Sequence, residues 1–170
     1  MSSSAAGTKR DISWMDRDNE TRPLIHGEPV LMRPRPAVHR GLFLRRLRQD
    51  YNAGALEHLP NPDRPRRIVA YALNEQSGTA DQGLNVVRAL IARQGYDVVH
   101  ELHDAYAPHA PQRRPGWSEA RRLVHCGVAD GIAVVDRDAV SRRDDEYEEE
   151  IHWIGQRPGL LLLAVPEAAT

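Results

Sequence analysis

Four short apolar segments alternate with helix-like segments along the last two thirds of the sequence, and this alternation constrains the fold most. IVAYAL begins at residue 68, YDVVHELHD at 96, DGIAVVD at 130 and LLLLAVP at 160. The first segment is apolar and partly β-branched, as expected of a buried parallel strand. The order βαβ, loop, αβαβ predicts an α/β fold: an open, mostly parallel sheet of about four to five strands with flanking helices.

The segments between the strands carry helical patterns. Residues 80–94 place four apolar side chains on one helical face, namely Leu84, Val87, Leu90 and Ile91. Gly95 follows where a helix commonly ends. SEARRLVHCG predicts a second helix, and DEYEEEIHWIG predicts a third whose first turn is acidic, as the helix dipole favours.

The first 66 residues differ from this body in charge and composition. They carry 12 Lys and Arg against 8 Asp and Glu, a net charge of +4, whereas residues 67–170 carry 11 against 16, a net charge of −5. Scattered prolines predict a largely disordered extension over residues 1–66, with one possible helix at 38–59. That basic helix could contact DNA or a partner, cover an edge of its own sheet, or be solvated.

The sequence also argues against several classes of protein. Its single cysteine, Cys126, excludes an internal disulfide and a cysteine-based zinc cluster. His100 and His103 fall on opposite faces of a strand, so we expect no metal site. Neither GxGxxG nor GxxxxGK[ST] occurs, so we expect no nucleotide cofactor. No apolar run approaches the roughly 20 residues that cross a bilayer, and no signal peptide is evident, which predicts a cytoplasmic protein without a membrane partner.

Six short motifs follow one another through the body of the chain. They are Tyr71-Ala72, Arg88-Ala89-Leu90, Asp104, Arg114-Pro115-Gly116-Trp117, Val134-Val135 and Asp138-Ala139-Val140-Ser141-Arg142. In order and spacing, from Arg67 to Glu167, they resemble the catalytic domain of the serine recombinases, the resolvases and invertases. The resemblance implies a resolvase-like domain over residues 67–170.

The resemblance also implies a chemistry. In this family a serine hydroxyl attacks a DNA phosphodiester without a metal, so arginines must carry the charge on the phosphoryl oxygens. The family's first strand ends in Tyr-x-Arg-x-Ser. Counted from Tyr71, Leu73 stands at the arginine and Glu75 at the serine. Counted from the Arg88 motif, Ser77 stands at the serine and Glu75 at the arginine, so neither register keeps the arginine.

The family's Asp-Arg-Leu-Ser-Arg motif is also incomplete. Ala139 stands at its first arginine, whereas Asp138 and Arg142 match, and Arg137 could substitute if its direction permits. The candidate catalytic residues of this degenerate site are Ser77, Arg142, Arg137 and Asp138.

Three further residues are candidates for binding, namely Tyr71, Glu75 and Arg114. A structural role competes with this one: Arg114 would anchor a loop, Trp117 would pack in the core, and residues 142–150 would form a solvated helix start.

Two classes of function remain open. We prefer a catalytically silent, resolvase-like domain, a DNA- or protein-binding module or a decaying part of a mobile element. Its partners would be DNA through the basic N-terminal segment, another protein, or a second copy. The alternatives are an active recombinase that uses Ser77 and a small nucleotide- or anion-binding protein that uses Arg142. Because the sequence ends at Thr170, soon after the last strand, we expect it to lack the family's long dimer-forming helix and site-reading domain.

Overall fold

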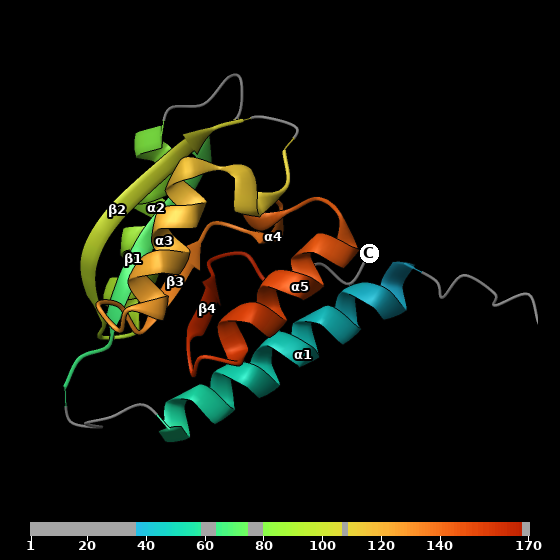
Figure 1. Cartoon of the computed structure of the whole chain (residues 1–170), viewed down its shortest axis with the longest axis horizontal. Helices are drawn as coiled ribbons and strands as arrows, with labels where there is room; N and C mark the ends of the chain where they lie inside the picture. Colours follow the sequence, from blue (N-terminus) through green and yellow to red (C-terminus); the bar gives the residue numbers. More distant parts are fainter. Residues whose placement is uncertain (1–36, 59–63, 75–79, 107–108, 168–170) are drawn as a thin grey trace, which may run out of the picture. The chain divides into compact units, whose positions relative to one another are not determined.

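Four parallel strands form the centre of the structure, a computed structural model that describes residues 37–58, 64–74, 80–106 and 109–167 (Figure 1). The strands are β1 (Arg67–Asn74), β2 (Asp97–Ala105), β3 (Gly131–Val134) and β4 (Leu160–Leu163). Their order across the sheet is β2-β1-β3-β4, and every neighbouring pair is parallel. The predicted parallel α/β fold is therefore confirmed, with four strands in the described residues.

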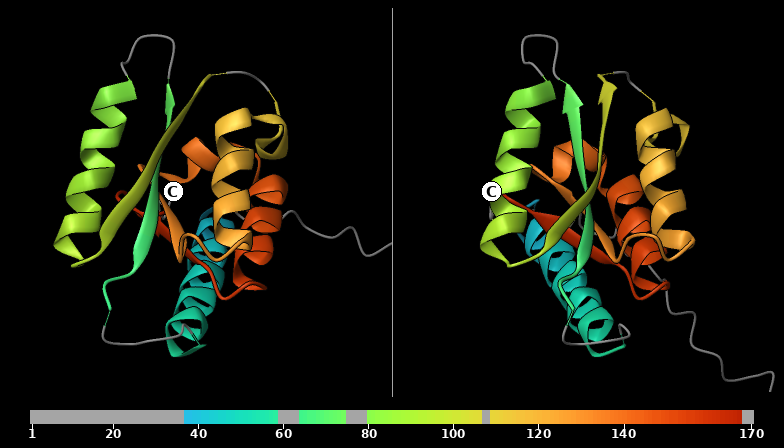
Figure 2. Two further views of the ribbon diagram at one scale, coloured as in Figure 1. Left: turned by 60° about the vertical axis from the view of Figure 1, so that its left-hand side comes forward. Right: turned by 90° about the vertical axis from the view of Figure 1, so that its left-hand side faces the viewer.

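Helices cover both faces of this sheet (Figure 2). Alternate residues of β1 point to opposite faces. Ile68, Ala70 and Ala72 pack with α2 (Ala80–Arg93) in one apolar cluster, whereas Val69 and Tyr71 pack in a second cluster with α3 (Pro115–His125) and α5 (Asp144–Gly155). β1 is buried on both sides because of this, which explains its continuous apolar sequence.

Local sequence features determine where two of the helices end or begin. The chain turns after α2 at Gly95, which has a positive φ of 71°. The short helix α4 (Arg137–Val140) follows β3, and the Asp136 side chain caps it by accepting a hydrogen bond from the Ala139 N–H at 3.0 Å. A single 3₁₀ turn, η2 (Pro111–Arg113), precedes α3.

The predicted basic helix is present as α1 (Ala37–His58), and it covers the outer edge of β4. The Asn52 carboxamide accepts from the Leu161 N–H and donates to the Leu161 C=O, both at 2.9 Å. The neighbouring Leu160 N–H points the other way, into the sheet, where it bonds the Asp130 C=O at 2.9 Å. Asn52 thus takes the hydrogen-bonding place of a further strand at this edge.

A buried ion pair also fastens α1 to the end of the described chain. Arg48 binds Glu167 through Nε at 2.7 Å and Nη2 at 2.8 Å, and the Tyr147 hydroxyl donates to the same carboxylate at 2.6 Å. Burial opposes the charged carboxylate, but these donors outweigh it and lower the pKa of Glu167 below its ordinary value.

The compact unit that includes the sheet begins at Arg35 and so includes α1 as well. The physical reason is that α1 is joined to β4 and α5 by hydrogen bonds and by buried side chains such as Leu44. The expected disorder of the residues before α1 lies outside the described part of the chain.

Candidate functional site at the strand ends

A hollow of about 240 Å³ lies at the carboxyl ends of β1 and β2, and we call it the strand-end hollow. The residues that line it are Leu73, Tyr106, His109, Ala110, Arg114, Asp138, Val140, Ser141, Arg142, Arg143 and Glu146. From β1 the chain continues to β2 on one side of β1, and then returns to β3 on the other side of β1. The strand order therefore reverses between β1 and β3. Open α/β sheets bind their ligands at such points.

A buried network fixes the wall of the hollow. The Tyr71 hydroxyl donates to Asp104 Oδ2 at 2.9 Å, and Asp104 also accepts from the N–H groups of Gly116 and Trp117 at the start of α3. Burial raises the pKa of Tyr71 well above its ordinary value, against the opposing effect of Arg114, so the hydroxyl stays a donor. These contacts attach α3 to the ends of β1 and β2.

Arg114 holds helix α4 in place. Its Nη1 donates to the Tyr71 hydroxyl at 3.2 Å and to the Ala139 C=O at 2.9 Å, and its Nη2 donates to the Val140 C=O. Only 4% of Arg114 is exposed. Because both terminal nitrogens serve protein oxygens, the structure gives Arg114 the geometry of a loop anchor.

Arg142 and Asp138 lie together on the rim. The Arg142 guanidinium lies 5.1 Å from the centre of the Tyr106 ring, and its Nε is 3.7 Å from Asp138 Oδ2. Both side chains are about half exposed, at 56% and 50%. Tyr106 was not predicted, although its place directly after β2 is the signal that could have found it, since strand ends meet at one edge.

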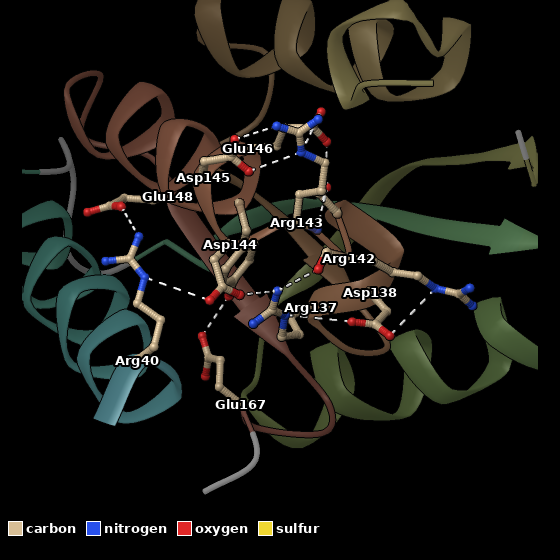
Figure 3. Close-up of polar contacts among 12 residues, drawn as sticks. Arg40, Arg137, Asp138, Arg142, Arg143, Asp144, Asp145, Glu146, Glu148 and Glu167 are labelled. Atoms are coloured by element: carbon tan, nitrogen blue, oxygen red, sulfur yellow. Dashed lines mark hydrogen bonds and ion pairs between the residues drawn. The ribbon is translucent and has the colours of Figure 1, made fainter. Parts of the chain in front are cut away.

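Figure 3 shows Arg137 beside Arg142 and Asp138: its Nη2 donates to the Arg142 C=O at 3.1 Å, and its Nε is 3.6 Å from Asp138 Oδ1. Its Nη2 is 2.7 Å from Asp144 Oδ1, and its guanidinium lies 5.4 Å from the centre of the Tyr147 ring. It is not among the residues that line the strand-end hollow. The Arg137 guanidinium is thus bound by Asp144, Asp138 and the Arg142 C=O.

The charged block at residues 142–150 starts α5 in a largely exposed position, as the sequence indicated, but Tyr147 and Glu150 within it are buried. Ser141 donates to Glu146 at 2.6 Å and accepts from the Arg143 N–H, which begins the helix. Glu150 is fully buried, where Trp117 Nε1 and Arg121 Nη1 donate to it at 3.0 and 3.1 Å. Burial raises the pKa of Glu150 above its ordinary value, against these donors.

Two candidate residues cannot be placed in this site. Glu75 and Ser77 follow Asn74 at the end of β1 but lie outside the described residues. Leu73, which stands at the family's arginine when counted from Tyr71, lines the hollow. Among the described residues, no group of three His, Cys, Asp or Glu could hold a metal ion.

Comparison with solved structures finds catalytic domains of similar fold. The N-terminal catalytic domain of TP901-1 integrase matches with a TM-score of 0.52 and 14% identity, over 58% of this chain and 77% of that one. The C-terminal catalytic domain of ISC1926 TnpA, an IS607-like serine recombinase, matches with a TM-score of 0.49 and 22% identity, over 59% and 69%. A serine recombinase from Sulfolobus solfataricus matches at 0.45 and 19%, over 62% and 71%. No protein-family model and no curated protein matches the sequence.

The chain has the fold of a serine recombinase catalytic domain. The resemblance predicted from the motifs is thus confirmed at the level of the fold. Within the described residues, no helix is long and apolar enough to span a bilayer.

Proposed function

We propose that this protein is a serine-recombinase-like domain, related to DNA recombination, that does not exchange DNA strands and acts as a binding module. Its partner would be DNA, another protein or a second copy of the chain. The TP901-1 integrase catalytic domain, which shares the fold, supports the link to recombination.

One observation supports the absence of strand exchange: the guanidinium groups at the strand-end hollow are engaged by acceptor groups of the protein itself. Arg114 donates to backbone carbonyls, Arg143 pairs with Asp145 at 2.6 Å, and Arg142 lies beside Asp138. Carboxylates also line the hollow, and they repel a phosphate. Removing one preorganised donor from a site of this kind costs on the order of 100- to 1000-fold in rate.

The motif positions at which the family's arginines are missing support the same proposal. Ala139 stands at the first arginine of the Asp-Arg-Leu-Ser-Arg motif, and the first-strand arginine is replaced by Leu73 in one register and by Glu75 in the other. Arg137 is paired with Asp144 and Asp138. In the register that makes Ser77 the nucleophile, a phosphoserine intermediate would therefore form without the charges that stabilise its transition state.

A covalent-capture assay tests the absence of strand exchange. The full chain and its Ser77→Ala variant are incubated with gapped duplex DNA, and protein–DNA adducts are resolved on a denaturing gel. We expect no adduct from either protein. An adduct formed by the parent chain and abolished in Ser77→Ala would contradict the proposal and establish the active enzyme instead.

Binding to duplex DNA over a salt series tests which partner the module takes. Electrostatic binding must weaken steeply as salt rises, because bound counterions are released from the phosphates. If the chain does not bind duplex DNA at low salt, the partner is another protein or a second copy. Light scattering over a concentration series would detect association with a second copy.

A further inference from the structure

Three arginines of the basic first 66 residues pair with carboxylates of residues 67–170. Arg48 pairs with Glu167, Arg64 binds Asp130 with two hydrogen bonds at 2.6 and 2.7 Å, and Arg40 contacts Asp144 and Glu148. Two arginines of α1, Arg40 and Arg48, thus pair with acidic residues of the body, as does Arg64 before β1. A surface that binds a polyanion requires guanidinium charge that carboxylates of the protein do not fully neutralise.

A second charged cluster lies where the last turns of α3 run beside α5, away from the strand ends (Figure 2). A hollow of about 270 Å³ opens there, lined by Ser118, Arg121, Arg122, His125 and Trp153. Arg157, just after α5, contacts two of these residues, His125 and Trp153. We call these six residues the α3–α5 patch.

The Trp153 ring orders two of the arginines. The guanidinium of Arg121 lies 4.0 Å from the ring centre, and that of Arg157 lies 4.2 Å from it. Arg157 is held further by its Nε, which donates to His125 Nδ1 at 3.1 Å, and by its Nη1, which donates to the Trp153 C=O at 3.1 Å. A guanidinium fixed in this way loses little conformational entropy when it binds a ligand.

The charges of the patch do not cancel. Arg121 is paired with Glu150 at 3.1 Å and Arg122 with Glu119 at 2.6 Å. Among the described residues, Arg157 has no carboxylate partner: its guanidinium contacts the His125 imidazole, the Trp153 carbonyl and the Trp153 indole. Three guanidinium groups therefore share two carboxylates, on a body whose net charge over residues 67–170 is 11 minus 16, or −5.

We propose that the α3–α5 patch binds a phosphate group of a nucleic-acid backbone, with Arg157 as its main contact. A planar guanidinium with donors to spare matches a phosphate oxyanion in both charge and shape. The concave site suits a compact anion better than a flat protein surface. The choice of nucleic acid rests on the proposed function, whereas the anion site rests on the patch alone.

The salt dependence of binding tests this assignment. Binding of the full chain to a labelled, generic DNA duplex is measured by fluorescence anisotropy over a salt series, for the parent and for Arg157→Gln. Losing one phosphate contact should weaken binding and reduce the slope of log affinity against log salt by about 1. Arg157→Lys keeps the charge and should keep most of the slope, which guards against a variant that merely disturbs α5.

A matched control is Arg88→Gln, which removes an exposed arginine that pairs with Glu101 on the other side of the sheet. We expect it to leave the slope unchanged. Equal slopes in Arg157→Gln and the parent would contradict the phosphate site at the α3–α5 patch but not DNA binding by the chain. Absence of binding at low salt would contradict both the phosphate site and DNA binding. Competition by poly-glutamate as strong as by unlabelled duplex would overturn the assignment to nucleic acid in favour of an acidic protein.

Discussion

Asp130 joins the segment that enters β1 to the turn that precedes β3. Its carboxylate accepts two hydrogen bonds from Arg64 and one from the Arg67 N–H at 2.8 Å, and only 5% of the residue is exposed. Burial by itself would raise the pKa of Asp130, but the donors from Arg64 and Arg67 outweigh it and lower the pKa to about 2.

This shift predicts how stability depends on pH. Because the folded pKa of Asp130, about 2, lies below the ordinary 3.8, its contribution is complete above about pH 4 and is lost as the pH falls toward 2. The contribution is on the order of 2 kcal/mol. Asp130→Asn should lower the free energy of unfolding at neutral pH and flatten its pH dependence between 4 and 2. Urea unfolding at a series of pH values measures both effects.

Asp145 provides the comparison for this prediction. The nearby Arg143 lowers the pKa of Asp145 to about 2 as well, yet the Asp145 side chain is 61% exposed. Solvent screens exposed pairs, so Asp145→Asn should change stability far less than Asp130→Asn. A larger effect from Asp145→Asn would mean that burial of the carboxylate does not decide the contribution.

Individual site residues could be predicted from the sequence only where the backbone fixes their direction. Tyr71 and Asp104 lie near the carboxyl ends of neighbouring parallel strands, so their meeting follows from the strand order. The direction of Arg137 does not follow from the backbone, because its long, flexible side chain is held by Asp144 and Tyr147. Glu150 was expected in a solvated segment, and its burial depends on Trp117 and Arg121, 33 and 29 residues away.

At the scale of elements, Gly155 sets how closely α1 approaches α5. A Cβ added at Gly155 would lie 2.1 Å from Cδ1 of Tyr51, much closer than real Cβ contacts. The Tyr51 hydroxyl is tied to His152 Nδ1 at 2.8 Å, which limits how the ring can move. The last turn of α5 therefore requires glycine for packing, although glycine is a poor helix former.

The substitution Gly155→Ala should destabilise the protein. Alanine in a helix ordinarily gains about 0.5–1 kcal/mol over glycine, but overpacking against Tyr51 should reverse the sign and cost about 1–3 kcal/mol. Gly54→Ala in α1 is the matched control, because a Cβ there meets nothing within 4 Å and should stabilise slightly. Thermal unfolding of the two variants compares them directly; stabilisation by both would show that α1 does not rest on α5 as the structure has it.

The strands and helices of the body were predictable from local sequence patterns. β1 is buried on both faces and is therefore a continuous apolar run, whereas α2 is buried on one face and repeats its apolar residues at helical spacing. The position of α1 was left among several alternatives. Its attachment depends on polar side chains, Arg48 and Asn52, whose partners Glu167 and Leu161 are 119 and 109 residues away. No local pattern records such pairs.

At the scale of the whole molecule, α1 completes the domain rather than extending it. It closes the edge of β4 through Asn52, places Leu44 in one apolar cluster and Ala55 in the other, and meets Glu167 through Arg48. The compact unit that contains the sheet begins at Arg35, and residues 1–34 carry five Lys and Arg against five Asp and Glu. Stability should therefore depend on where the chain is shortened.

A chain that begins at Arg35 should unfold at nearly the same temperature as the full chain, whereas one that begins at Arg64 should not fold stably. The shorter chain keeps the Arg64 contact to Asp130 but loses the buried Leu44, the Arg48 ion pair and the cover over β4. Together these losses amount to about 5 kcal/mol or more, which is comparable to the whole stability of many domains. Circular dichroism melts and size-exclusion chromatography would compare the two. If the chain from Arg64 stayed monomeric and melted within a few degrees of the full chain, α1 would be an appended helix, and the boundary of the domain would lie at residue 67 after all.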